Sequence, residues 1–232
     1  MNGEIYGNTA EIANRLVAKT YQKVCTGLAI TGVIMTLMAV FMTKWVMSMG
    51  ITTSLLILVV ALGLMFALSR SVTNDNTNAS TTNTIYYLMT ILFGVSLSPV
   101  LIYYDVKTIG LAMLGTAVMF GGLTFYANTT KRDFIGFGAY LTWGLLAAIV
   151  LSLVSMIFHI ALLYILVDVV MLVIFAVFII FDTQSVKRFA DSVQSEEQLQ
   201  KYSTIGALSI YLDILNIFQI LLELIGMGDN RD

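Results

Sequence analysis

The sequence predicts an all-α integral membrane protein that crosses the bilayer seven times. Of its 232 residues, 58% are hydrophobic and only 11% are charged, whereas about 25% are charged in an ordinary globular domain. Seven successive runs of mainly apolar residues also approach the length of about 20 residues that a helix needs to cross the hydrocarbon of a bilayer. We therefore expect helices throughout and little chain outside the membrane.

The seven expected segments account for most of the chain. Their boundaries are 24–42, 52–68, 85–104, 109–126, 135–157, 162–181 and 205–225. They predict a single transmembrane domain over residues 24–226, with a polar cytoplasmic segment at 1–23 before it and a polar tail at 227–232 after it. A run rich in Asn, Thr and Ser at 71–83 predicts a solvated loop between the second and third segments. Pro99, the only proline, predicts a kink in the third segment.

The distribution of basic residues predicts the orientation. If the N-terminus is cytoplasmic, nine of the twelve Lys and Arg residues fall in inside segments, as the positive-inside rule requires. These nine are Arg15, Lys19, Lys23, Arg70, Lys131, Arg132, Lys187, Arg188 and Lys201. The first 20 residues lack the pattern of a cleavable signal peptide. Together with the compact loops, this favours a bacterial inner (plasma) membrane, with an organellar membrane as the alternative.

Two aspartates in the last two segments are the strongest functional signal. Asp182 follows the sixth segment in the string FDTQ, and Asp213 lies inside the seventh in the string YLDILN. An ionised side chain in hydrocarbon costs about 2.5–3.5 kcal/mol, so an intramembrane acid indicates a function and predicts a partner. Each aspartate is the obvious partner of the other.

The seventh segment has one polar side along its length. At 100° per residue, six polar side chains fall within an arc of roughly 140°. They are Tyr202, Ser209, Asp213, Asn216, Gln219 and Glu223. We expect this stripe to face the protein interior or water, where Ser209, Asn216, Gln219 and Glu223 would line an ion pathway; hydrogen bonding to neighbouring helices is the alternative. Asp168, in the sixth segment, is read as an interfacial acid or as the mark of an outer mouth.

Four strings together resemble the Bax inhibitor family of transmembrane proteins. They are FGVSLSP in the third segment, FYANTTKRDFIGFGAYL between the fourth and fifth, FDTQ after the sixth and YLDILNIF in the seventh. The resemblance spans nearly the whole chain. It implies a seven-helix bundle with the C-terminal helix central, acting as a pH-sensitive calcium leak channel. It also implies that Asp182 and Asp213 close the cytoplasmic side and that a basic residue, best matched by Arg70, engages them.

A physical mechanism agrees with that expectation. Two carboxylates held together in a low dielectric cannot both ionise cheaply, so they share a proton. A protonated pair can join the two helices through a hydrogen bond, whereas a deprotonated pair repels itself or takes up a cation. Calcium prefers carboxylate and carbonyl oxygens, so we expect Asp182 and Asp213 to bind Ca²⁺ transiently and Arg70 to replace the cation at rest.

Other functions fit the sequence less well. A proton-coupled cation exchanger could use the same two acids. An intramembrane aspartyl protease of the presenilin type would carry a GxGD string where this chain has IYLD, and a Pro-Ala-Leu string that is absent; we expect no enzymatic activity. A membrane interaction protein without transport would act through loops, but these are short and carry no recognised binding motif.

The composition also limits cofactors and partners. A net charge of -2 provides no basic surface for nucleic acid. One Cys and one His cannot build a zinc, haem or iron–sulfur site. We therefore expect no cofactor, with the lipid bilayer, calcium ions and protons as the partners.

Overall fold

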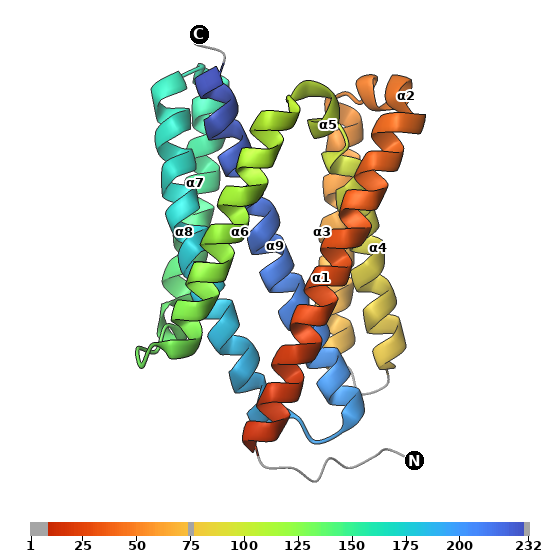
Figure 1. Ribbon diagram of the computed structural model, residues 1–232, viewed down its shortest axis with the longest axis vertical. Helices are drawn as coiled ribbons and strands as arrows, with labels where there is room; N and C mark the ends of the chain where they lie inside the picture. Colours follow the sequence, from red (N-terminus) through yellow and green to blue (C-terminus); the bar gives the residue numbers. More distant parts are fainter. Residues whose placement is uncertain (1–8, 74–76, 230–232) are drawn as a thin grey trace. The chain divides into compact units, whose positions relative to one another are not determined.

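The structure is a computed structural model that describes residues 9–73 and 77–229. Every regular element in these ranges is a helix, which confirms the all-α prediction (Figure 1). In chain order the elements are α1 (Thr9–Phe41), α2 (Thr43–Met47), α3 (Ile51–Thr73), α4 (Ala79–Leu97), α5 (Val100–Tyr103), α6 (Val106–Thr129), the 3-10 turn η1 (Ile135–Phe137), α7 (Gly138–Phe158), α8 (Ala161–Arg188), the 3-10 turn η2 (Phe189–Ser192) and α9 (Glu196–Asp229).

Six of the described helices are long and apolar enough to cross a membrane. They begin at Thr9, Ala79, Val106, Ile135, Ala161 and Glu196. In α3 the stretch that is apolar enough, Val59–Val72, is shorter than a full span. The seventh span therefore stays a prediction.

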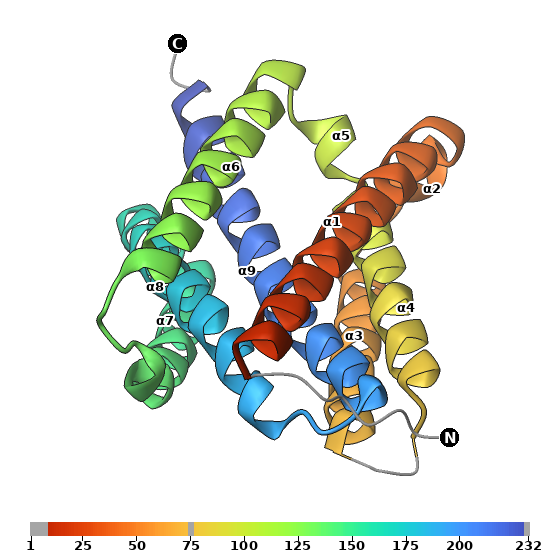
Figure 2. The same ribbon diagram turned by 60° about the horizontal axis from the view of Figure 1, so that its bottom comes forward.

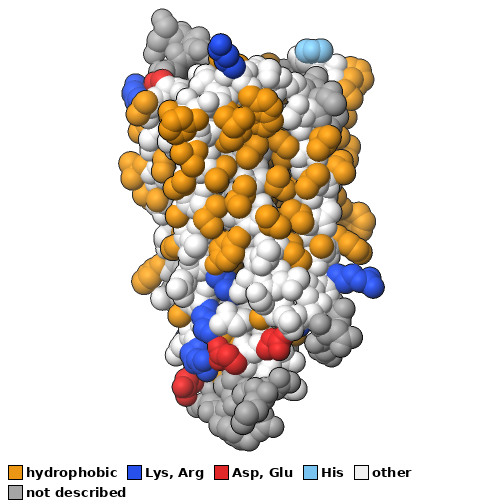
Figure 3. Space-filling model, turned by 90° about the vertical axis from the view of Figure 1, so that its right-hand side faces the viewer, with side chains coloured by type: hydrophobic (Ala, Val, Ile, Leu, Met, Phe, Trp, Pro, Cys, Tyr) orange, Lys and Arg blue, Asp and Glu red, His pale blue; other side chains and the backbone are white. Residues whose placement is uncertain are grey.

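Many large apolar side chains on the surface of these helices are exposed, as expected for helices that face lipid. Phe66, Phe125 and Trp143 are each more than 70% exposed, and such extensive apolar exposure is unfavourable in water. In Figure 3 hydrophobic side chains form a broad band across the visible face, and charged side chains lie mostly toward the two ends of that face. The chain is a membrane protein with lipid around these surfaces.

The first helix begins earlier than the sequence predicted. Residues 9–23 of the expected polar segment are helical and continuous with α1, because Ile12, Leu16, Thr20 and Lys23 recur at helical spacing and are all buried. Residues 1–8 of that segment lie outside the described residues. At the other end α9 continues to Asp229, into the expected polar tail, and residues 230–232 are not described.

The Asn-, Thr- and Ser-rich run is mostly the ends of two helices. The expectation of a solvated loop is wrong on both sides of residues 74–76, which lie outside the described ranges: α3 reaches Thr73 and α4 begins at Ala79. Hydroxyl groups in this run have partners inside the protein. Ser71 Oγ of α3 and Thr82 Oγ1 of α4 lie 2.6 Å apart and form a hydrogen bond between the two helices. At Pro99 the third span is interrupted, with α4 ending at Leu97 and α5 starting at Val100.

The chain forms two compact units, and α8 and α9 each contribute to both. Unit 1 comprises Met1–Asp105 and Val186–Tyr211; unit 2 comprises Val106–Ser185 and Leu212–Asp232. In unit 1, α4 packs against both α1 and α3 (Figure 2). The contact between α1 and α4 is close because Gly94 on α4 faces Thr31 and Ile34 on α1.

A buried hydrogen-bond network fixes α9 within unit 1. Thr31 Oγ1 on α1 donates to the Thr90 carbonyl of α4 at 2.9 Å, so its 2.6 Å contact with Tyr211 Oη of α9 must use the tyrosine proton. Tyr86 of α4 donates to the Lys23 carbonyl of α1 at 3.0 Å. Both tyrosines are fully buried, so this network joins three helices without water.

Unit 2 is organised around the contact between α8 and α9. Phe175 and Ile179 of α8 and Ile217 and Ile220 of α9 form one buried cluster, and side chains of α6 and α7 cover it. In α9, 61% of the most apolar window is buried, against at most 33% in the other candidate spans of the described residues. The two helices that carry the predicted aspartates therefore form the core of this unit.

The close approach of α1 and α4 can be tested with Gly94→Ala. A Cβ at this position would lie 2.8 Å from Ile34 Cβ and 2.9 Å from the Thr31 carbonyl oxygen, and overpacking of this kind costs about 1–3 kcal/mol. We expect a lower melting temperature of the detergent-solubilised protein, measured by size-exclusion chromatography after heating. Gly32→Ala on α1, where nothing lies within 4 Å, is the control and should be neutral or stabilising. Equal melting of both variants would contradict the packing.

Candidate functional site

Asp182 and Asp213 both belong to unit 2, and their side chains interact. Asp182 lies on α8 and is partly buried, whereas Asp213 lies on α9 and is only 5% exposed. The two carboxyl groups lie close enough to influence each other. An ionised carboxylate has no proton to donate, so a hydrogen bond between the two requires that one of them is protonated.

The apolar core determines the positions of these two acids. On α8, Asp182 follows Ile179 of the core by three residues; on α9, Asp213 precedes Ile217 of the core by four. Each spacing is about one helical turn, so each acid continues the buried face of its helix. The hydrophobic packing that joins α8 to α9 therefore also brings the two carboxyl groups together, one turn beyond the core.

Few other groups compensate for the burial of Asp213. Its Oδ2 atom is buried and accepts no hydrogen bond from an amide, hydroxyl or basic group of the described residues. A buried polar atom without a hydrogen-bond partner is costly, so Asp213 needs a proton or a cation to compensate its burial. Two carboxyl groups in this state can hold one proton between them or bind a cation.

Gln184 lies on α8, two residues after Asp182, and binds the loop between α6 and η1. Its Nε2 donates to the Arg132 carbonyl at 2.9 Å, and its Oε1 accepts from the Phe134 amide at 2.8 Å. The strings FDTQ and TTKRDF, which are far apart in the sequence, therefore meet here. Asp133 supports the same turn, since its Oδ1 accepts from the Ile135 amide at 2.8 Å.

The polar residues of α9 occupy different environments. Asn216 donates through Nδ2 to the Leu212 carbonyl of its own helix at 2.8 Å. Glu223 accepts a hydrogen bond of 2.7 Å from Tyr164 Oη of α8. Ser209 is partly buried and Gln219 is exposed. Their role as pathway-lining residues stays a prediction.

Arg70 lies on α3, in unit 1, and its side chain is exposed. Its engagement of the aspartate pair also stays a prediction. Among the described residues, no group of three or more His, Cys, Asp or Glu side chains could hold a metal ion. The aspartate pair thus offers two carboxyl groups to a cation, which suits passing contact better than permanent coordination.

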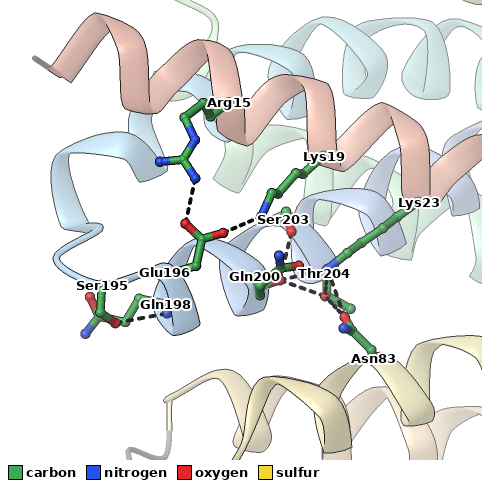
Figure 4. Close-up of polar contacts among 10 residues, drawn as sticks. All are labelled: Arg15, Lys19, Lys23, Asn83, Ser195, Glu196, Gln198, Gln200, Ser203 and Thr204. Atoms are coloured by element: carbon green, nitrogen blue, oxygen red, sulfur yellow. Dashed lines mark hydrogen bonds and ion pairs between the residues drawn. The ribbon is translucent and has the colours of Figure 1, made fainter. Parts of the chain in front are cut away.

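A second polar cluster, in unit 1, was not singled out from the sequence. Figure 4 shows Arg15 and Lys19 of α1 directed at Glu196, the first residue of α9, and Lys23 directed toward Asn83 and Thr204. Arg15 Nη2 lies 2.6 Å from Glu196 Oε2, and Lys19 Nζ contacts Oε1 of the same carboxylate. These ion pairs connect the beginnings of α1 and α9.

Lys23 is the unusual member of this cluster, because it is only 8% exposed and its hydrogen-bond acceptors are uncharged. Its Nζ donates to Asn83 Oδ1 at 2.8 Å, to the Gln200 carbonyl at 2.9 Å and to Thr204 Oγ1 at 2.6 Å. Three acceptors satisfy the three protons of an ammonium group. The sequence does contain one signal for this burial, since Lys23 follows Leu16 by seven residues on the same face of α1.

Comparison with known proteins relates these features to a family. A family model described as "Inhibitor of apoptosis-promoting Bax1" matches residues 13–230. The inner membrane protein YbhL of Escherichia coli K12 is 31% identical over 191 residues, which cover 82% of this chain and 78% of YbhL. An uncharacterized protein of Borreliella burgdorferi is 28% identical over 221 residues, covering 94% of each chain.

A membrane protein of Vibrio cholerae is similar as well, with 29% identity over 193 residues that cover 80% of this chain and 81% of the relative. The family match therefore extends over the described helices of both units, including the α8 and α9 residues that form the aspartate pair. The chain is a membrane protein of the Bax inhibitor family.

Proposed function

We propose that this protein is a pH-sensitive calcium leak channel in which Asp182 and Asp213 form the gate. The observation that carries the proposal is the proximity of their carboxyl groups, one helical turn beyond the packed contact of α8 and α9. Burial of Asp213, with few other donors to its Oδ2, makes that contact sensitive to a single proton. Membership of the Bax inhibitor family agrees with this function.

The gate works through the charge of the pair. With one shared proton, the hydrogen bond holds α8 and α9 together one turn beyond their apolar core. When that proton leaves, two negative charges face each other in a poorly solvated site, and they repel or attract a cation. Calcium is the preferred cation because it is hard and binds carboxylate oxygens; Arg70 is the candidate that neutralises the pair at rest.

We place the protein in a bacterial inner membrane with its N-terminus in the cytoplasm. The similar protein YbhL of Escherichia coli is named as an inner membrane protein, which supports the choice of membrane. The excess of Lys and Arg in the expected inside segments supports the orientation. Asp182 would then lie at the cytoplasmic end of α8.

Replacing either gate residue by asparagine tests the assignment. Asn cannot ionise, so in Asp182→Asn and in Asp213→Asn the calcium flux into dye-loaded liposomes should lose most of its dependence on pH. A gate that releases one proton changes by at most about tenfold per pH unit in the wild type. Asp191→Asn, which alters an exposed acid on η2, is the control and should keep the wild-type profile.

The gate assignment fails if both variants retain the wild-type pH profile while folding and inserting normally. The same liposomes separate a leak from a proton-coupled exchanger, the alternative that the same acid pair would serve. An exchanger would drive calcium against its gradient when a pH gradient is imposed, whereas a leak would only dissipate the calcium gradient.

The hydrogen bonds between Gln184 and the loop that joins α6 to η1 provide an independent test of the gate region. Gln184→Ala removes two hydrogen bonds to the backbone of residues 132 and 134, each worth about 1 kcal/mol. We expect the resting calcium leak to rise by about fivefold if one such bond holds the closed arrangement. Asn128→Ala is the matched control, because that side chain bonds only the Thr124 carbonyl of its own helix. A leak that is unchanged in Gln184→Ala would separate this connection from gating.

A further inference from the structure

A second acidic pair joins α8 and α9, away from Asp182 and Asp213. Asp168 lies on α8 and is only 2% exposed, and Glu223 of α9 is near enough for its charge to act on Asp168. Asp168 precedes Asp182 by 14 residues, about 21 Å along a helix axis at 1.5 Å per residue. Both pairs lie within unit 2, but they are distinct sites.

Three oxygen-bearing side chains converge on this second location. Tyr164 and Asp168 are four residues apart and so share one face of α8. Tyr164 Oη donates to Glu223 Oε2 at 2.7 Å. This hydrogen bond holds the Glu223 carboxylate toward α8, on the side that carries Asp168.

Asp168 is left with an unused acceptor. Its Oδ2 atom is buried and has no hydrogen-bond partner among the described residues. A buried carboxylate oxygen beside a second acid is unfavourable unless a proton or a cation compensates it. Contacts among the described residues therefore do not compensate the burial of the Asp168 carboxyl group.

An open depression of the surface borders Tyr164. It has a volume of about 610 Å³ and is lined by residues that include Ser155, His159, Tyr164 and Met227. Tyr164 therefore borders the depression and also binds Glu223. An ion in this depression would therefore lie beside the tyrosine that binds Glu223.

We propose that Asp168, Glu223 and Tyr164 form a second cation site, which takes a hard divalent cation such as calcium. The site rests on the proposed calcium transport and would be a second station on the route. Two carboxylates and one hydroxyl supply fewer than the six to eight oxygens that calcium prefers, so water completes the shell and binding is weak. Weak binding is what a conducted ion requires, because it must also leave.

Terbium luminescence tests the site directly, because Tb³⁺ occupies calcium sites and is excited by a nearby tyrosine. The full chain, purified in detergent, is titrated with Tb³⁺ and then competed with Ca²⁺. We expect Asp168→Asn combined with Glu223→Gln to weaken Tb³⁺ binding by at least about tenfold, since it removes both charged ligands. Tyr164→Phe keeps both acids and should reduce the sensitised emission without abolishing binding.

Matched controls make the result decisive. Asp182→Asn combined with Asp213→Asn should retain the emission that comes from the second site, and Asp191→Asn should leave the titration unchanged. Unaltered Tb³⁺ affinity in the Asp168 and Glu223 double variant overturns the inference. If the double variant does not fold, the single variant Glu223→Gln, at a partly buried position, is titrated in its place, and unaltered affinity there overturns the inference equally.

The liposome assay separates this inference from the proposed function. Tb³⁺ binding that depends on Asp168 and Glu223, without calcium flux in the wild type, would uphold the site and reject the channel. Flux gated by Asp182 and Asp213, with Tb³⁺ binding independent of Asp168 and Glu223, would uphold the channel and reject the second site.

Discussion

The packing of α8 against α9 is the constraint on which the candidate site depends. Phe175 and Ile179 on one helix and Ile217 and Ile220 on the other form a buried cluster. In a bilayer the surrounding lipid is as apolar as these side chains, so close van der Waals packing holds the two helices together and fixes the positions of the two acids. Both helices continue into the other compact unit, so each links the site residues to a second set of contacts.

Buried charged groups are treated in two different ways in this protein. Lys23 in unit 1 has three oxygen acceptors for its ammonium protons, an arrangement that stabilises one structure. Asp168 and Asp213 in unit 2 each have a buried oxygen that no amide, hydroxyl or basic group of the described residues satisfies. A satisfied network favours rigidity, whereas an unsatisfied acid responds to protons and cations. This contrast is the physical basis for locating function in unit 2.

Much of this organisation was visible in the sequence, but several details were not. Hydropathy predicted the apolar parts of α8 and α9, but α8 continues past the expected end at 181 to Arg188, and α9 begins at Glu196 instead of 205. The cost of an acid in hydrocarbon singled out Asp182 and Asp213 as candidates. The same reasoning placed Lys23 in a polar cytoplasmic segment, whereas it is a buried residue of α1. It also read residues 71–83 as loop, because Ser and Thr look solvated until their hydroxyl groups find partners such as the pair Ser71 and Thr82.

The sequence by itself determined the class of the protein, its family and the two acids of the candidate site, because these follow from composition, from helical spacing and from contiguous strings. The tertiary structure decided which polar groups meet: Gln184 with the backbone of Arg132 and Phe134, Tyr164 with Glu223, and Lys23 with Asn83 and Thr204. Each of these contacts joins helices or connections that are far apart in the chain. Spacing along one helix specifies a face, but only the packing of several helices specifies what that face touches.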